Sequence, residues 1–179
     1  MDDFLHITAL WMHILGIALF VGPQFFLAFA WIPASRGITD LPTRAKAMRT
    51  ITSRFGVIGG VGLAMIVVAG SYLIATWRDY YAQPDDVEFT SLRFGAIFIV
   101  KMTVLLVMLA LTGLHTFVVG PRLLEQIDIQ AAGGRVDEAG ILKLRKLSMM
   151  LSIAALVLTL VIMVMGASMS STSYSLQEL

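Results

Sequence analysis

The sequence predicts an all-α polytopic membrane protein, a bundle of four transmembrane helices with helical extensions on the cytoplasmic side. Of its 179 residues, 58% are hydrophobic and only 14% are charged, and the mean hydropathy is +0.83, whereas a soluble domain is about half apolar and about a quarter charged. The apolar residues fall into four long blocks, each at or above the ~20 residues that cross a bilayer as a helix. These observations exclude an ordinary water-soluble enzyme and predict one integral membrane domain over residues 1–179.

The four blocks set the boundaries of the expected spans, at about residues 4–32, 55–77, 94–119 and 147–169. The first block follows an acidic start, Met1-Asp2-Asp3, where a secretory signal peptide would carry Lys or Arg, so we expect a retained span. Pro23 inside it should kink the helix, because proline removes a backbone hydrogen bond. In the second span Gly56 and Gly60 have the spacing that lets two helices approach closely, which we interpret as bundle packing rather than a dedicated dimer seam.

The connections on one side of the membrane are expected to contain helix. Asp40 offers a cap and Pro42 a first-turn proline, so the second span should begin as a basic helix below the membrane. The third span should run past Pro121, and the Gly133-Gly134 pair should then turn the chain. Asp137 should cap the helix that leads into the fourth span. The sequence shows no convincing internal repeat.

Lys and Arg in the connections predict the orientation. The first and third connections together carry ten basic residues, whereas the second carries two among four acidic ones. By the positive-inside rule the first and third connections lie in the cytoplasm. Both termini, which lack Lys and Arg, are therefore expected outside.

Charge and cysteine content narrow the possible chemistry. Thirteen basic against twelve acidic residues give a net charge of +1, so nothing points to a nucleic-acid partner. The absence of cysteine excludes disulfides, thiolate-held zinc, iron–sulfur clusters and thiol catalysis. A metal or cofactor would have to be held by His, Met, Lys, carboxylates or the backbone.

Four ionisable side chains lie within the expected spans, where they are costly and by default indicate function. They are His6 and His13 in the first span and Lys101 and His115 in the third. His13 lies about nine residues below Phe4 and Lys101 about seven below Phe94, so the two groups share a level in the outer half of the membrane. His115 follows Lys101 by fourteen residues, roughly 21 Å along the helix axis, and lies near the cytoplasmic face.

This arrangement predicts a polar pocket built from His13 and Lys101, with His6 at its mouth. A neutral imidazole ligates haem iron, copper or zinc, and a buried ammonium pairs with a propionate or a substrate carboxylate. The alternative is that His13 is a hydrogen-bonded core histidine and that Lys101 extends toward the outer interface. His6 is seven residues from His13, roughly 10 Å, which is too far for both to ligate one haem iron. Methionines in the spans are interpreted mainly as lipid-facing or core residues.

Two segments resemble a known superfamily. The first span, L-H-I-T-A-L-W-M-H-I-L-G-I-A-L-F-V-G-P, and the third, V-K-M-T-V-L-L-V-M-L-A-L-T-G-L-H-T-F-V-V-G-P-R-L, are similar to the copper-resistance D (CopD) family and to the HemJ-type protoporphyrinogen oxidases. The resemblance implies a four-helix module that binds haem b, with the pair His13 and Lys101 as its important residues. Two departures are the F-V-G-P step of the first span, where the families have W-V-G-G, and a second span without a HemJ-like proline pattern.

Three classes of function follow from these observations. The first is a haem b redox protein, with His13 as metal ligand, His13 and Lys101 as catalytic pair, and His6 and His115 as further cofactor-binding candidates. It would exchange electrons with quinone or oxidise a porphyrinogen. The second is copper transport or resistance, and the third is a noncatalytic subunit of a larger complex. We expect a bacterial plasma-membrane location and a homo-oligomer or larger assembly, because the histidines of one chain cannot supply two axial ligands at one level.

Overall fold

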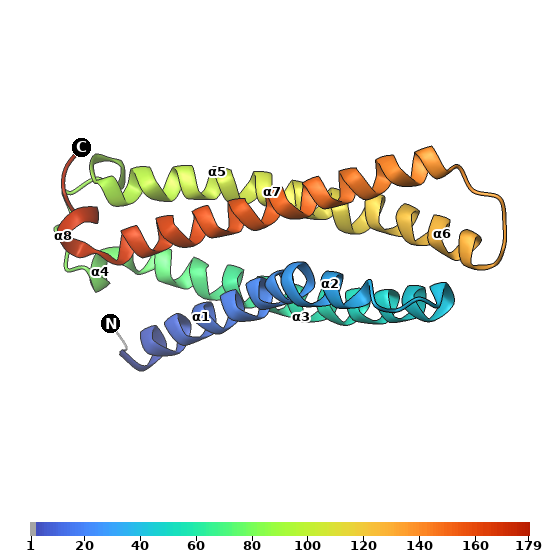
Figure 1. Cartoon of the computed structure of the whole chain (residues 1–179). Coiled ribbons are helices and arrows are strands. Elements are labelled where there is room, and N and C mark those ends of the chain that lie inside the picture. Colours follow the sequence, from blue (N-terminus) through green and yellow to red (C-terminus); the bar gives the residue numbers. More distant parts are fainter. Residues whose placement is uncertain (1–2) are drawn as a thin grey trace. The chain divides into compact units, whose positions relative to one another are not determined.

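The computed structural model describes residues 3–179 and is all-α (Figure 1). The described part of the chain holds no strand beyond an isolated bridge between Leu92 and Glu178. Four of its helical stretches are long and apolar enough to cross a membrane: Asp3–Ser35, Leu41–Ala75, Arg93–Ala131 and Glu138–Ser170. The all-α class and the four spans are therefore confirmed.

The surface of these helices is apolar. Large hydrophobic side chains such as Phe29, Val57, Phe117 and Val164 are exposed, Phe117 to 80%. Such a surface is stable in hydrocarbon rather than in water. The chain is thus an integral membrane protein.

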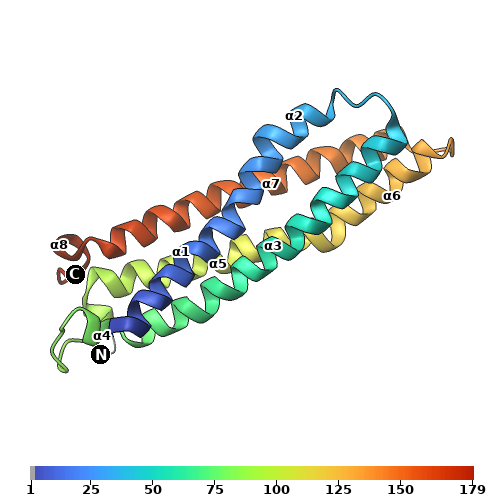
Figure 2. The ribbon, with the colours of Figure 1, turned by 90° about the horizontal axis from the view of Figure 1, so that it is seen from below.

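The structure divides into two compact units, one ending at Val87 and the other running from Glu88 to Leu179. The first unit is a helical hairpin. Helix α1 (Asp3–Phe25) continues through the π-helical segment η1 (Phe26–Trp31) into α2 (Ile32–Ser35). The chain then turns into α3 (Leu41–Ala75), which packs along α1 (Figure 2).

Two glycines bring α1 and α3 into backbone contact. A Cβ atom added to Gly16 would lie 2.7 Å from the Gly62 carbonyl oxygen, and one added to Gly62 would lie 2.7 Å from the Gly16 carbonyl oxygen. Both residues are buried. By contrast, a Cβ at Gly56 or Gly60 would meet nothing within 4 Å. On α3 the close approach therefore uses Gly62, and not Gly56 and Gly60, the pair whose spacing suggested close packing.

Helix α3 starts where the sequence predicts a cap. Asp40 is the N-cap, and its carboxylate accepts a hydrogen bond of 3.0 Å from the Thr43 backbone N–H. Hydrogen bonds from the Thr43 hydroxyl and from this N–H hold the pKa of the Asp40 carboxyl below its usual value. The cap is therefore retained at neutral pH and is lost only as the pH falls through that lowered pKa.

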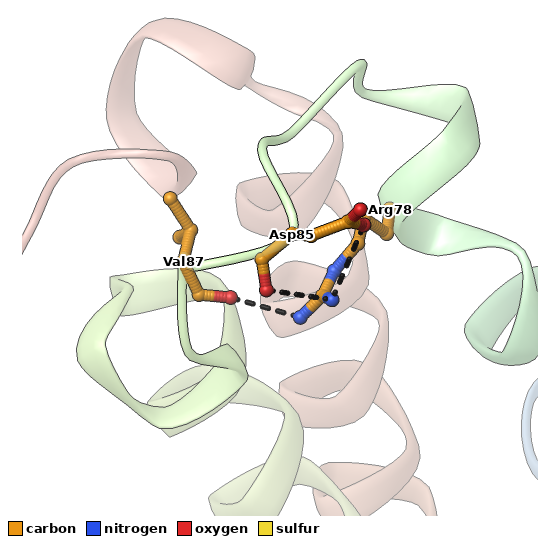
Figure 3. A network of polar contacts seen from close by, with 3 residues as sticks. All are labelled: Arg78, Asp85 and Val87. Atoms are coloured by element: carbon orange, nitrogen blue, oxygen red, sulfur yellow. Dashed lines mark hydrogen bonds and ion pairs between the residues drawn. The ribbon is translucent and has the colours of Figure 1, made fainter.

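After α3 a short helix, α4 (Trp77–Tyr80), leads into the connection that the sequence places outside. Arg78 organises this connection: its guanidinium donates to the backbone carbonyls of Asp85 and Val87 at 3.1 and 2.9 Å. It also lies 3.8 Å from the Asp85 carboxylate (Figure 3). One side chain thus satisfies two carbonyls of a loop that has few helical bonds of its own.

The second unit repeats the hairpin form. After the 3₁₀ turn η2 (Phe89–Ser91), helix α5 (Arg93–Leu114) continues through the π-helical segment η3 (His115–Val119) into α6 (Gly120–Ala131). Helix α7 (Glu138–Ser170) packs along α5, and a short α8 (Thr172–Ser175) follows it. The turn before α7 contains Gly133 at φ 77°, a left-handed conformation that favours glycine, as the sequence predicts. Asp137 is the N-cap residue of α7, but its side chain makes no capping hydrogen bond.

The π-helical segments are features that the sequence analysis missed. Each ends two residues before a proline, Pro33 after η1 and Pro121 after η3. A proline ring clashes with the carbonyl four residues earlier and has no N–H to donate, and a wider turn relieves that clash. At Pro23, where we expected the kink, α1 stays α-helical through Phe25, and the departure from α geometry begins at Phe26.

Candidate functional site

His13 reaches across the first hairpin to the backbone of α3. Its Nδ1 lies 3.2 Å from the carbonyl oxygen of Ile66. A carbonyl oxygen can only accept, so Nδ1 carries the hydrogen and the imidazole lone pair is on Nε2. This is the orientation in which metal-ligating histidines are commonly held, with one ring nitrogen donating to a carbonyl and the other directed to the metal.

Gly70 makes this contact possible. A Cβ atom added to Gly70 would lie 3.1 Å from His13 Cε1 and 3.3 Å from Nδ1, so the imidazole lies directly against the glycine. Gly70 follows Ile66 by four residues, one helical turn, and the Ile66 carbonyl points toward it. The missing side chain opens a notch in α3 that the His13 ring enters.

His6 is held differently. It is only 8% exposed and its ring stacks on Tyr80 of α4, with ring centroids 3.9 Å apart and planes 11° apart. Its Nδ1 is buried and has no hydrogen-bond partner among the described residues. Burial, together with the neighbouring Tyr80, raises the pKa of the adjacent Tyr81 phenol. His6 thus lies at the α4 end of the hairpin and fastens α4 to α1.

Lys101 lies in the α5–α7 contact of the second unit. Its ammonium Nζ is 4.0 Å from the Met169 sulfur, and a Cβ added to Gly166 would lie 3.8 Å from the same nitrogen. Within the described residues no ion pair joins Lys101 to a carboxylate. An ammonium in an apolar span costs about 2.5–3.5 kcal/mol on insertion scales, which makes this position a candidate site for an anion.

His115, the first residue of η3, lies at a different level of the second unit. Its Nε2 is 3.5 Å from the Ser152 hydroxyl oxygen, and that hydroxyl donates its hydrogen to the Ser148 carbonyl at 2.9 Å. Nε2 is therefore the donor, and the buried Nδ1 has no partner among the described residues. Lys101 and His115 are fourteen residues apart on α5 and η3, and their α7 neighbours Gly166 and Ser152 are also fourteen apart. Lys101 and His115 therefore contact α7 at different levels of the second unit.

The four predicted residues therefore fall into two pairs by unit. His6 and His13 belong to the first unit and contact α4 and α3, respectively, whereas Lys101 and His115 belong to the second and contact α7. The pairing of His13 with Lys101 stays a prediction. Sequence reasoning did not assign Gly70 or Gly166 to these contacts. Gly70 is one of five glycines in the second span, and Gly166 is the only glycine in residues 147–169.

No group of three or more His, Asp or Glu side chains in residues 3–179 is placed to hold a metal ion. The methionines are mixed: Met108 is almost fully buried, Met163 is exposed, and Met169 contacts Lys101.

Comparisons of the chain with protein-family models, with curated proteins and with solved structures each find no match.

Proposed function

We propose that this chain is a haem b-binding membrane protein with a redox role, and that His13 is an axial ligand of the iron. The single observation that carries the proposal is the Nδ1–H hydrogen bond from His13 to the Ile66 carbonyl at 3.2 Å. It fixes the tautomer and orients the ring, so that Nε2 would be the nitrogen that holds the iron. The resemblance of the first span to CopD and HemJ-type proteins selects the same residue.

The donor set fits haem better than a bare zinc ion. A protein-only zinc site needs three or four converging ligands, and no group of three or more His, Asp and Glu side chains in residues 3–179 is placed to hold a metal ion. A porphyrin brings four nitrogen ligands of its own, so the protein has to supply only one or two axial groups. A single well-oriented histidine is sufficient for that purpose.

Lys101 is the second residue of the proposal. Its ammonium lies 4.0 Å from the Met169 sulfur and faces Gly166, and no carboxylate of the described residues forms an ion pair with it. A haem propionate would supply the counter-charge. That His13 and Lys101 serve one haem is our prediction from their equal depth in the first and third spans. His115 lies fourteen residues from Lys101 along the same helical stretch. This separation disfavours His115 as a ligand to the haem whose propionate Lys101 would pair with.

In this proposal haem supplies one-electron chemistry, and the partner is a membrane-soluble quinone or a porphyrinogen. The chain contributes orientation and environment. The Ile66 carbonyl makes the His13 imidazole a stronger donor, and the apolar helix surfaces keep the site in a medium of low dielectric constant. Both effects set the potential at which an electron is exchanged.

The test is the visible absorption spectrum of the purified full-length chain. We expect a Soret band, and a change on reduction typical of a protein-bound b haem, after expression with haem supply and extraction in mild detergent. A helical, monodisperse preparation that never acquires a Soret band, even after haem is added, would overturn the proposal. Copper bound in its place would favour the copper-transport alternative.

We further propose that residues 36–54 and 122–146 face the cytoplasm of a bacterial plasma membrane and that the termini lie outside. Because the chain has no cysteine, single cysteines report cleanly. Asp85→Cys, at a fully exposed position, should react with an impermeant maleimide in intact spheroplasts. Lys46→Cys, also exposed, should react only after permeabilisation. The opposite pattern would reverse the assigned orientation.

A further inference from the structure

The two units follow one plan, which the sequence alone does not reveal. In each, a long helix passes through a π-helical segment, a proline follows two residues later, and the chain turns to an aspartate N-cap. A second helix follows, of 35 residues in α3 and 33 in α7, and a single residue separates it from a four-residue helix, α4 or α8. Many membrane proteins are built from such internal repeats.

His13 and Lys101 hold the same place in this plan along their first helices. His13 precedes Pro33 by twenty residues, and Lys101 precedes Pro121 by twenty. When residues 3–36 are aligned with 91–124 in this register, only Phe29 with Phe117 and Pro33 with Pro121 are identical. The correspondence is therefore set by structure more than by sequence.

The second helices, α3 and α7, also correspond at the residues that face His13 and Lys101. His13 contacts Gly70, thirty residues after the Asp40 cap, and Lys101 lies over Gly166, twenty-nine residues after Asp137. Both glycines end an Ile-x-Val-x-Gly sequence, residues 66–70 and 162–166. The carbonyl that accepts from His13 belongs to the first residue of that sequence, Ile66, and Ile162 is its counterpart in α7.

We infer that His13 and Lys101 are one and the same side-chain position of a duplicated hairpin, and that Gly70 and Gly166 are the equivalent residues that face it on the second helices. In each copy the glycine lies against the polar group, since an added Cβ would come within 3.1 Å of His13 at Gly70 and within 3.8 Å of the Lys101 ammonium at Gly166. This inference rests on the proposed function, and it gives the two copies of the hairpin different roles. One copy presents an imidazole for coordination, and the other presents an ammonium for an anionic group such as a carboxylate.

The two glycines should differ in their tolerance of change. At Gly70 the nearest imidazole atom is only 3.1 Å from an added Cβ, which is tighter than ordinary contact, whereas 3.8 Å at Gly166 is ordinary van der Waals contact. Gly70→Ala therefore requires the His13 ring to shift by a few tenths of an ångström. Because its hydrogen bond to the Ile66 carbonyl is already 3.2 Å long, we expect that shift to weaken the bond. Gly166→Ala should leave Lys101 where it is.

The experiment uses the full-length chain in detergent, without haem, labelled with ¹⁵N-histidine. Ring ¹⁵N shifts distinguish a protonated nitrogen from an unprotonated one, and the His13 signal is assigned from its loss in His13→Asn. We expect a single Nδ1-protonated tautomer for His13 in wild type and in Gly60→Ala, a matched control in open space. In Gly70→Ala this signature should be replaced by a mixture of tautomers.

The equivalence of the two positions is tested in the same way with Lys101→His. The new imidazole should show the Nδ1-protonated signature of His13, because the Ile162 carbonyl and Gly166 offer the same notch. Val100→His, one residue away on an exposed face, should show mixed tautomers. The inference fails if Lys101→His resembles Val100→His, or if Gly70→Ala leaves the His13 signal unchanged. The NMR test is made on haem-free protein, so its result does not depend on haem binding. If the wild-type chain never acquires a Soret band, the proposed function fails, but the NMR test of the duplicated position can still be interpreted.

Discussion

His13→Ala is expected to abolish the Soret band of the haem-loaded chain, reducing bound haem at least tenfold relative to wild type. The physical reason is that an alanine offers the iron no lone pair. The measurement is the haem-to-protein ratio from absorbance, made on protein whose helicity by circular dichroism matches wild type.

His115→Ala is the matched control, since it also removes a partly buried histidine from a span. Its partner is Ser152, at a level fourteen residues from that of Lys101, so we expect its haem content to stay within a factor of two of wild type. Haem lost from His115→Ala but kept by His13→Ala would move the ligand to the second unit. Haem kept by both variants would show that His13 is a hydrogen-bonded packing residue.

Gly16→Ala is expected to destabilise the first hairpin by about 2–3 kcal/mol, as overpacking of a tight contact does. The added Cβ would lie 2.7 Å from the Gly62 carbonyl oxygen and 3.0 Å from the Ile66 backbone nitrogen. Because the nearest atom belongs to backbone, the neighbour cannot rotate away and the two helices must separate. Denaturant or SDS titration of the full-length chain, followed by circular dichroism, measures the loss.

Gly60→Ala provides the comparison on the facing helix. Its Cβ would meet nothing within 4 Å, so this change should be neutral or slightly stabilising, because alanine favours helix by about 0.5–1 kcal/mol over glycine. Equal stability of the two variants would contradict the close crossing of α1 and α3. Gly62→Ala should behave as Gly16→Ala, since its Cβ meets the same contact from the other side.

Helix existence and helix ends were largely predictable because their signals are local. The apolar blocks predicted four spans, the Asp40-Leu41-Pro42 sequence predicted the start of α3, and Gly133 predicted the turn before α7. The helical extensions followed from caps and prolines in the same way. The π-helical turns were not predicted, because the clash that they relieve depends on the exact phase at which a proline enters an existing helix.

The candidate site was predictable only in its residue types. A histidine or lysine within an apolar span stands out by its cost, so His13 and Lys101 could be selected without a structure. Their neighbours could not, because the face that one helix turns toward another depends on the rotation of both. Five glycines in the second span offered several possible seams, and the pair at ideal spacing, Gly56 and Gly60, is not in contact with α1.

The sequence by itself determined that this is an all-α membrane protein with four spans, and which ionisable side chains its apolar helices contain, since both follow from hydropathy summed along the chain. Only the tertiary structure decided that Gly16 and Gly62 form the crossing of the first hairpin, that Gly70 places His13 on the Ile66 carbonyl, and that Gly166 lies beneath Lys101 in a hairpin of the same plan. Those facts depend on which residues of two separate helices come to the same level and face each other, and packing alone fixes that register.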